Sequence, residues 1–286
     1  MRRRILWTVI GVPLTLIVIG GGAALSIPAV RHLVLGLWNL PDRLPALAGN
    51  SQVHFEPGAE DYARDVAALL SDAITRVEVV HGRPFVRPAT VGVYATMEAY
   101  AIANGRGSTV PVGITTFGRV NLSPKLFSTQ HQRLRAILTH ELSHAHVVGW
   151  IGGFTYIHLP NWFKEGLAVL VSDGGGAELV SEEEALAAIR RGQKIVIDDA
   201  GSMKSLGDVR LERAPSDKPA WYPIVLAYRE AGMFVTYLRE SDGPAFDRMM
   251  NAILGGNSFA EAMTTGYHDH ALSLWRKFLT SSPDRK

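Results

Sequence analysis

Two histidines four residues apart lie near the middle of this 286-residue sequence, where residues 139–144 read T-H-E-L-S-H. On an α-helix the side chains at positions i and i+4 project from one face, so His140 and His144 can hold one metal ion. Glu141 completes an H-E-x-x-H pattern, in which the carboxylate is no ligand but takes a proton from a metal-activated water. The pattern predicts a catalytic zinc site.

The residues around the motif favour this interpretation. Leu134, Ile137 and Leu138 recur at helical spacing, and the segment around the motif is largely uncharged, which predicts a buried helix. Two imidazoles and a carboxylate would be costly to bury without partners, and a metal ion with a water supplies those partners. The alternative is a pair of core histidines satisfied by hydrogen bonds.

A third ligand is expected, because catalytic zinc sites use three protein ligands and keep one position open. Glu165 offers it within residues 161–168, N-W-F-K-E-G-L-A, a second predicted helix that Pro160 opens. The alternative for Glu165 is an exposed helix carboxylate. Asp173 and Glu178 are weaker candidates because they flank the glycine turn at 174–176.

The combination of H-E-x-x-H with a later W-F-x-E-G-x-A resembles the gluzincin class of zinc metallopeptidases, most closely the peptidase MA-like family of bacterial membrane-associated or secreted proteins. The resemblance spans about residues 85–280 and is strongest over 137–170. It implies a zincin-like α+β fold, a Zn²⁺ cofactor held by His140, His144 and Glu165, and peptide or protein substrates.

A tyrosine is also implied by the resemblance. In the aminopeptidase N-like branch of gluzincins, a later helix begins with a tyrosine that donates a hydrogen bond to the oxyanion. Tyr228 stands at the matching place, and Tyr222 is the alternative.

Two positions depart from the expected pattern. Val169 stands where thermolysin-like enzymes carry a carboxylate that orients a ligand histidine, so that orienting partner must come from elsewhere, such as a backbone carbonyl. His146 lies about 240° around the helix from His140, too far to share a metal, and is predicted to be structural.

The N-terminus predicts export. Three arginines precede a run from Ile5 to Val30 without any charge, which is long enough to form a transmembrane helix closed by Arg31. The excess of arginine before the run places the following chain outside the cytoplasm, as a single-pass protein of the cell membrane. The alternative is a signal peptide cleaved near the small residues at 22–24, which would leave a secreted protein.

The predicted organisation has three parts: a transmembrane anchor or signal peptide at 1–31, a juxtamembrane linker at 32–47, and a metallopeptidase domain at 48–286. There is no cysteine, so no thiolate can bind the metal. The formal net charge of +2, which includes the three N-terminal arginines, suggests no nucleic-acid partner.

The expected fold class is α+β: a small mixed sheet with the active-site helix before Gly149, then a mostly helical lobe. Residues 112–114 and 119–123 are expected to form the sheet edge above the metal, where an extended peptide could add as a strand, although an internal hairpin is the alternative. The other expected elements are a strand at 90–94 and helices at 60–80, 97–103, 182–191, 222–238, 244–254, 258–265 and 271–279.

The predicted function is zinc-dependent peptide hydrolysis with Glu141 as the general base. An endopeptidase is favoured over an aminopeptidase, because the G-x-M-E-N sequence that holds a substrate amine in aminopeptidases is absent. The alternative is a membrane-tethered interaction or assembly module that binds metal without turnover. The presence of Glu141 argues against it, since a purely structural zinc site would have four protein ligands.

Overall fold

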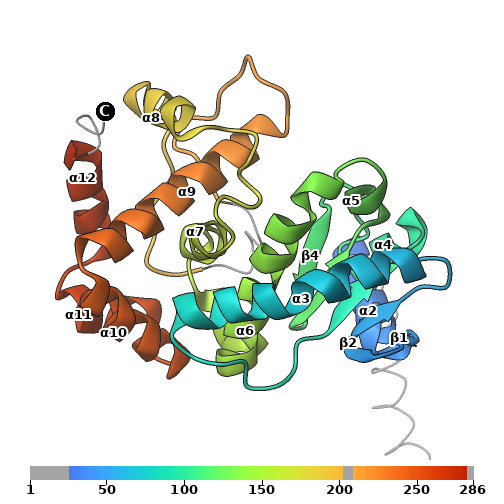
Figure 1. Ribbon diagram of the computed structural model, residues 1–286. Coiled ribbons are helices and arrows are strands. Elements are labelled where there is room, and N and C mark those ends of the chain that lie inside the picture. Colours follow the sequence, from blue (N-terminus) through green and yellow to red (C-terminus); the bar gives the residue numbers. More distant parts are fainter. Residues whose placement is uncertain (1–25, 202–208, 282–286) are drawn as a thin grey trace, which may run out of the picture.

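The structure, a computed structural model, describes residues 26–201 and 209–281. A small β-sheet and the helices of the first half occupy one side of the molecule, and the helices of the second half occupy the other (Figure 1). Helices α6 (Leu134–His158) and α7 (Asn161–Val171) lie between these two parts. The two predicted metal-binding segments therefore sit at the centre of the chain's fold.

The sheet has five strands in the order β1 (Ala46–Leu47), β2 (Asn50–Phe55), β3 (Val91–Val93), β5 (Arg119–Leu122) and β4 (Gly113–Thr116). The three central strands are parallel, and β1 and β4 are antiparallel to their neighbours. The predicted strand at 90–94 is confirmed. The expectation that residues 112–114 and 119–123 both form the sheet edge is confirmed for β4 and wrong for β5, which pairs on both sides.

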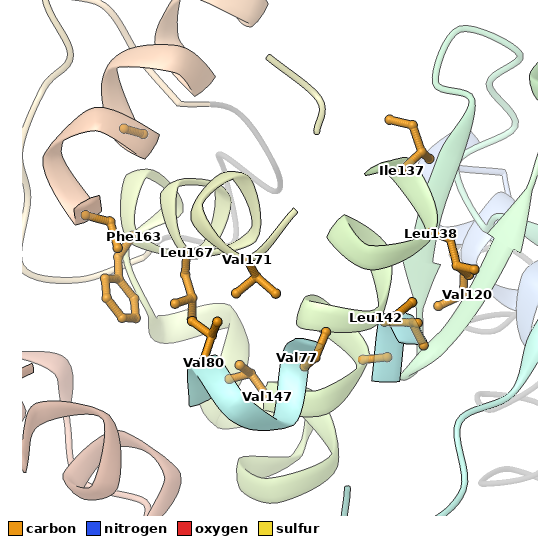
Figure 2. Packing of buried hydrophobic residues seen from close by; sticks show 14 of the residues in the cluster. Val77, Val80, Val120, Ile137, Leu138, Leu142, Val147, Phe163, Leu167 and Val171 are labelled. Carbon is orange, nitrogen blue, oxygen red and sulfur yellow. The ribbon is translucent and has the colours of Figure 1, made fainter. Parts of the chain in front are cut away.

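Helix α6 is held by apolar side chains from three directions. Leu142 of α6 lies close to Val77 of α3 (Glu60–His81), Leu138 lies close to Val120 of β5, and Leu167 and Val171 of α7 belong to the same buried cluster (Figure 2). Burying one such side chain contributes roughly 1.5–3 kcal/mol. The helix that carries the H-E-x-x-H motif is thus fixed on a packed layer.

Two glycines explain the close packing of α7 on α9 (Tyr222–Ser241). A Cβ on Gly166 would lie 2.5 Å from the carbonyl oxygen of Ala231, and a Cβ on Gly232 would lie 2.4 Å from Cγ1 of Val169. Gly166 follows the candidate ligand Glu165 because α9 passes there. Val169 therefore packs on α9, and the partner that orients a ligand histidine must come from another segment.

Helix α9 is the centre of the second half. The helices that pack on it are α8 (Glu182–Arg190), α10 (Gly243–Leu254) and α12 (Ala271–Ser281), while α11 (Phe259–Tyr267) packs on α10. All four agree with the predicted helices to within three residues at each end. The mostly helical second lobe is confirmed.

The remaining elements are short: η1 (Pro41–Arg43), α4 (Met97–Ala103), α5 (Pro124–Ser128) and η2 (His131–Arg133). The hydroxyl of Thr96 accepts a hydrogen bond from the amide of Ala99 and so caps α4, whose predicted range of 97–103 is confirmed. Residues 32–47, expected as a linker, hold most of α2 (Pro28–Trp38), η1 and β1. Pro41 lies 2.8 Å from where a Cβ on Gly92 would be, so η1 packs directly on the sheet.

The predicted fold class needs a correction at its N-terminal end. Arg31, expected to close a transmembrane helix, lies inside α2, which packs on α4. A Cβ on Gly36 would be 2.6 Å from Cα of Gly105, which shows how closely α2 approaches the domain. Within 26–201 and 209–281, no helix has the length and apolar character needed to cross a membrane.

The described part of the chain is therefore an α+β domain, and the predicted transmembrane helix is not among its helices. Residues 1–25, which hold the rest of the predicted span and the alternative cleavage site, lie outside the described residues. The cellular location stays a prediction.

Candidate metal centre

The three predicted ligands meet in the buried space between α6 and α7. Nε2 of His140 lies 3.1 Å from Nε2 of His144, and Oε2 of Glu165 lies 3.3 Å and 3.5 Å from these two nitrogens. All three side chains are buried. Helix α6 supplies two of them from adjacent turns, and α7 supplies the third, as the sequence predicts.

The spacing of these atoms fits a metal ion. Three donors at about 2.0–2.1 Å from one ion and at tetrahedral angles would lie about 3.3 Å from one another. The observed separations bracket that value. A buried His140–His144–Glu165 group that could hold a metal ion is therefore present, while the identity of the metal is not shown.

A backbone carbonyl orients the first histidine. Nδ1 of His140 lies 2.9 Å from the carbonyl oxygen of Gly175, and because a carbonyl only accepts, Nδ1 must carry the proton. In the neutral imidazole the lone pair of Nε2 then points at the other two ligands. A Cβ on Gly175 would lie 2.6 Å from the carbonyl oxygen of Ala136, so only glycine lets this turn come so close to α6.

A phenol contacts the second histidine, and nothing in the sequence pattern predicts it. The hydroxyl of Tyr156 lies 2.8 Å from Nδ1 of His144. Burial, with the nearby Glu165 and Glu141, raises the pKa of Tyr156 well above its usual range, so the phenol is protonated. Both ligand histidines thus have a partner on the nitrogen that faces away from the cluster.

The cluster carries negative charge suited to a cation. Burial alone would raise the pKa of Glu165, but His144 and His140 hold it below its usual range, so the carboxylate is ionised. Burial alone would lower the pKa of His140, and the bond to Glu165 together with the charge of Glu141 raises it instead. A cation is thus favoured at the point where the two lone pairs and the carboxylate converge.

Glu141 lies beside the cluster and is tied to the edge strand. The hydroxyl of Thr115 on β4 lies 2.8 Å from Oε2 of Glu141 and 2.8 Å from its backbone oxygen. A Cβ on Gly113 would lie 2.9 Å from Cγ of Glu141, so glycine lets β4 approach this carboxylate. The sequence predicts the edge strand, but the role of Thr115 becomes visible only in the fold.

The two candidate tyrosines lie in different surroundings. The ring of Tyr228 lies nearly parallel to the imidazole of His140, with centroids 6.2 Å apart and an interplanar angle of 13°. Tyr222 packs instead in a small separate cluster with Val180 and Leu226. Only Tyr228 is placed next to the metal ligands.

The two weaker candidate ligands, Asp173 and Glu178, lie outside the cluster. Asp173 pairs with Arg76 at 2.7 Å, and Glu178 pairs with Arg133 at 3.0 Å. His146 points away from the metal ligands toward α3, so its predicted structural role is confirmed.

Lys164, next to Glu165 on α7, is buried, with 7% of its surface exposed. Burial lowers its pKa to about 8, so the ammonium keeps its charge at neutral pH. Its Nζ lies 4.9 Å from the ring centroid of Tyr156 and 3.5 Å from the carbonyl oxygen of that residue. A positive charge therefore stands directly beside the phenol that contacts His144.

Comparison with known proteins adds nothing to this geometry: no family model, no curated protein and no solved structure matches the chain. The resemblance to gluzincins therefore stays a prediction from the sequence motifs.

Proposed function

We propose that this protein is a zinc-dependent metallopeptidase, more specifically an endopeptidase, with Glu141 as its general base. The observation that carries the proposal is a buried three-donor group, His140, His144 and Glu165, beside a carboxylate that is not part of that group. Three protein ligands with an adjacent base are typical of catalytic zinc sites, whereas structural zinc sites have four ligands. Bound zinc supplies Lewis-acid chemistry and lowers the pKa of water towards about 7.

The chain's own residues support proton transfer in such a reaction. Thr115 holds one oxygen of Glu141 at 2.8 Å, which orients the carboxylate between the edge strand and the ligands. Glu141 takes one proton from the attacking water as its oxygen bonds to the peptide carbonyl carbon. It then passes that proton to the departing amine nitrogen as the C–N bond breaks.

The position of β4 favours peptides as substrates. Among the described strands, β4 pairs with β5 only, so its other side has no strand partner. An extended peptide can pair with such an edge through main-chain hydrogen bonds. Because Thr115 of β4 touches Glu141, a peptide along this edge would pass next to the general base.

The test compares the wild type with Glu141→Gln in a cleavage assay on a diverse peptide library with zinc present. Glutamine is nearly isosteric and cannot accept the proton, so cleavage should fall by about 10²–10⁴ while zinc content stays unchanged. Glu182→Gln, on the exposed first turn of α8, is the matched control and should cleave as the wild type does. Equal cleavage by Glu141→Gln would mean that a contaminating protease is responsible.

The burial of the ligands favours a second candidate, a metal-binding interaction or assembly module without turnover. His140 and Glu165 are only 4% and 7% exposed, so access to the centre is narrow. This candidate predicts zinc binding by the wild type with no cleavage of any peptide in the library. The same experiment therefore distinguishes the two.

A further inference from the structure

Tyr156 reaches His144 only because α6 is broken. On an unbroken helix, twelve residues rise about 18 Å, too far for a phenol to contact an imidazole. At Gly152 the backbone adopts φ 74° and ψ 160°, a region of conformational space that is essentially restricted to glycine. The chain is redirected there, and the last turn of α6 brings the hydroxyl of Tyr156 to 2.8 Å from Nδ1 of His144.

The contact decides which nitrogen of His144 can bind a metal. To ligate through Nε2, which faces His140 and Glu165, a neutral imidazole must carry its proton on Nδ1. The phenol oxygen of Tyr156 can accept a hydrogen bond from that N–H. It thereby favours the ligating tautomer and holds the ring in its orientation, as outer partners of metal-bound histidines do.

Lys164 holds the phenol in turn. Its ammonium lies 4.9 Å from the ring centroid of Tyr156, within the range of a cation–π contact, and 3.5 Å from the carbonyl oxygen of the same residue. Lys164 directly precedes the ligand Glu165 on α7. One segment of α7 thus supplies both the third ligand and the group that fixes the partner of the second ligand.

We propose that Tyr156 is the positioning residue of His144, held in place by the break at Gly152 and by Lys164. The proposal rests on the metal centre put forward above. It means that a segment without any ligand, the last turn of α6, sets the metal affinity of the centre.

The test measures zinc affinity of the full chain by competition with a chromophoric chelator, together with the visible spectrum of the Co²⁺-loaded protein. Tyr156→Phe keeps the ring and removes the oxygen, and it should weaken zinc binding about 10–100-fold and change the cobalt spectrum. Tyr267→Phe is the matched control, because that hydroxyl donates at 2.7 Å to the carbonyl of Leu238, in the other lobe. It should leave affinity and spectrum unchanged.

Lys164→Met keeps the apolar stem, removes the charge beside the ring, and should weaken zinc binding about 2–10-fold, as expected for one cation–π contact. If denaturant unfolding of metal-free Tyr156→Phe shows no folded state, Lys164→Met tests the positioning role of Tyr156 in its place. Zinc affinity and cobalt spectrum unchanged from the wild type in folded Tyr156→Phe would overturn the inference and leave the metal centre standing. Failure of the wild type itself to bind zinc would instead overturn the proposed centre.

Discussion

Helix α6 carries two buried histidine clusters on opposite faces, and they differ in what surrounds the ring nitrogens. On one face, Nε2 of His140 and Nε2 of His144 face each other at 3.1 Å beside a carboxylate. On the other face, Nδ1 of His146 lies 2.9 Å from Nδ1 of His81. The histidines of both clusters are buried, so burial alone does not distinguish the clusters.

The second cluster is a linear chain of hydrogen bonds, and we call it the closed chain because a backbone carbonyl and a hydroxyl occupy its two ends. The carbonyl of Arg83 accepts from Nε2–H of His146, whose Nδ1 then accepts from Nδ1–H of His81. Nε2 of His81 accepts from the hydroxyl of Ser143. Every ring nitrogen has a partner, and both imidazoles are neutral in this arrangement.

The pKa values of the histidines also differ between the two clusters. Burial, and then the neighbouring His146, lower the pKa of His81 well below its usual range. On the other face Glu165 raises the pKa of His140. The comparison teaches that a buried histidine pair suits a metal only when lone pairs converge and a carboxylate supplies negative charge.

The largest expected effect is the loss of the metal in Glu165→Ala. Removing the carboxylate leaves only two imidazoles, as in the His81–His146 pair on the opposite face. Bound zinc should therefore fall from about one per chain to near none. Metal analysis of the purified protein measures this. Asp173→Ala is the control, and retention of zinc by Glu165→Ala with loss in Asp173→Ala would mean that the wrong third ligand has been chosen.

A smaller loss is expected from removing the hydroxyl of Tyr228, whose ring stacks on His140 beside the metal ligands. Tyr228→Phe should lower kcat for peptide cleavage by about 10²–10³, the usual contribution of one oxyanion donor, without changing the zinc content. Tyr222→Phe should have little effect, because that ring packs in a separate cluster. The opposite ranking of the two variants in steady-state assays would exchange their roles.

Breaking the closed chain should lower the free energy of unfolding and leave zinc affinity unchanged. His81→Leu leaves Nδ1 of His146 without its donor, and a buried polar atom without a partner costs about 1–3 kcal/mol. Denaturant unfolding of metal-free protein should show this loss, while zinc affinity stays as in the wild type. A large drop in zinc affinity would mean that the two faces are coupled.

The smallest expected effect is a pH dependence that belongs to the closed chain. His81 has a folded-state pKa below its unfolded value, so the unfolded chain binds more protons, and stability falls as pH drops below about 6.5. Each proton taken up on unfolding costs about 1.4 kcal/mol per pH unit. His81→Asn, whose amide can still donate to His146, should flatten this slope.

Unfolding midpoints from pH 7.5 to 5.0, with chelator present, measure the slope. Identical slopes in His81→Asn and the wild type would show that another group titrates.

Sequence periodicity determined the parts of the site that lie on regular helices. The spacing of His140 and His144 places them on one face whatever else the chain does, and Glu165 lies in the predicted helix that follows, α7. The cap at Thr96 and the helices of the second half follow from equally local signals. Each depends on residues a few positions apart, which a linear pattern contains.

Only the tertiary structure decided the partners of those ligands. Tyr156 meets His144 through the backbone break at Gly152, Thr115 meets Glu141 because Gly113 admits the edge strand, and the carbonyl of Gly175 reaches His140 through a glycine turn. The docking of α2 around Arg31, where the charge pattern predicts a transmembrane helix, depends on contact with Gly105. These contacts join segments far apart in the chain, and their geometry is set by the packing of backbones, which local periodicity does not contain.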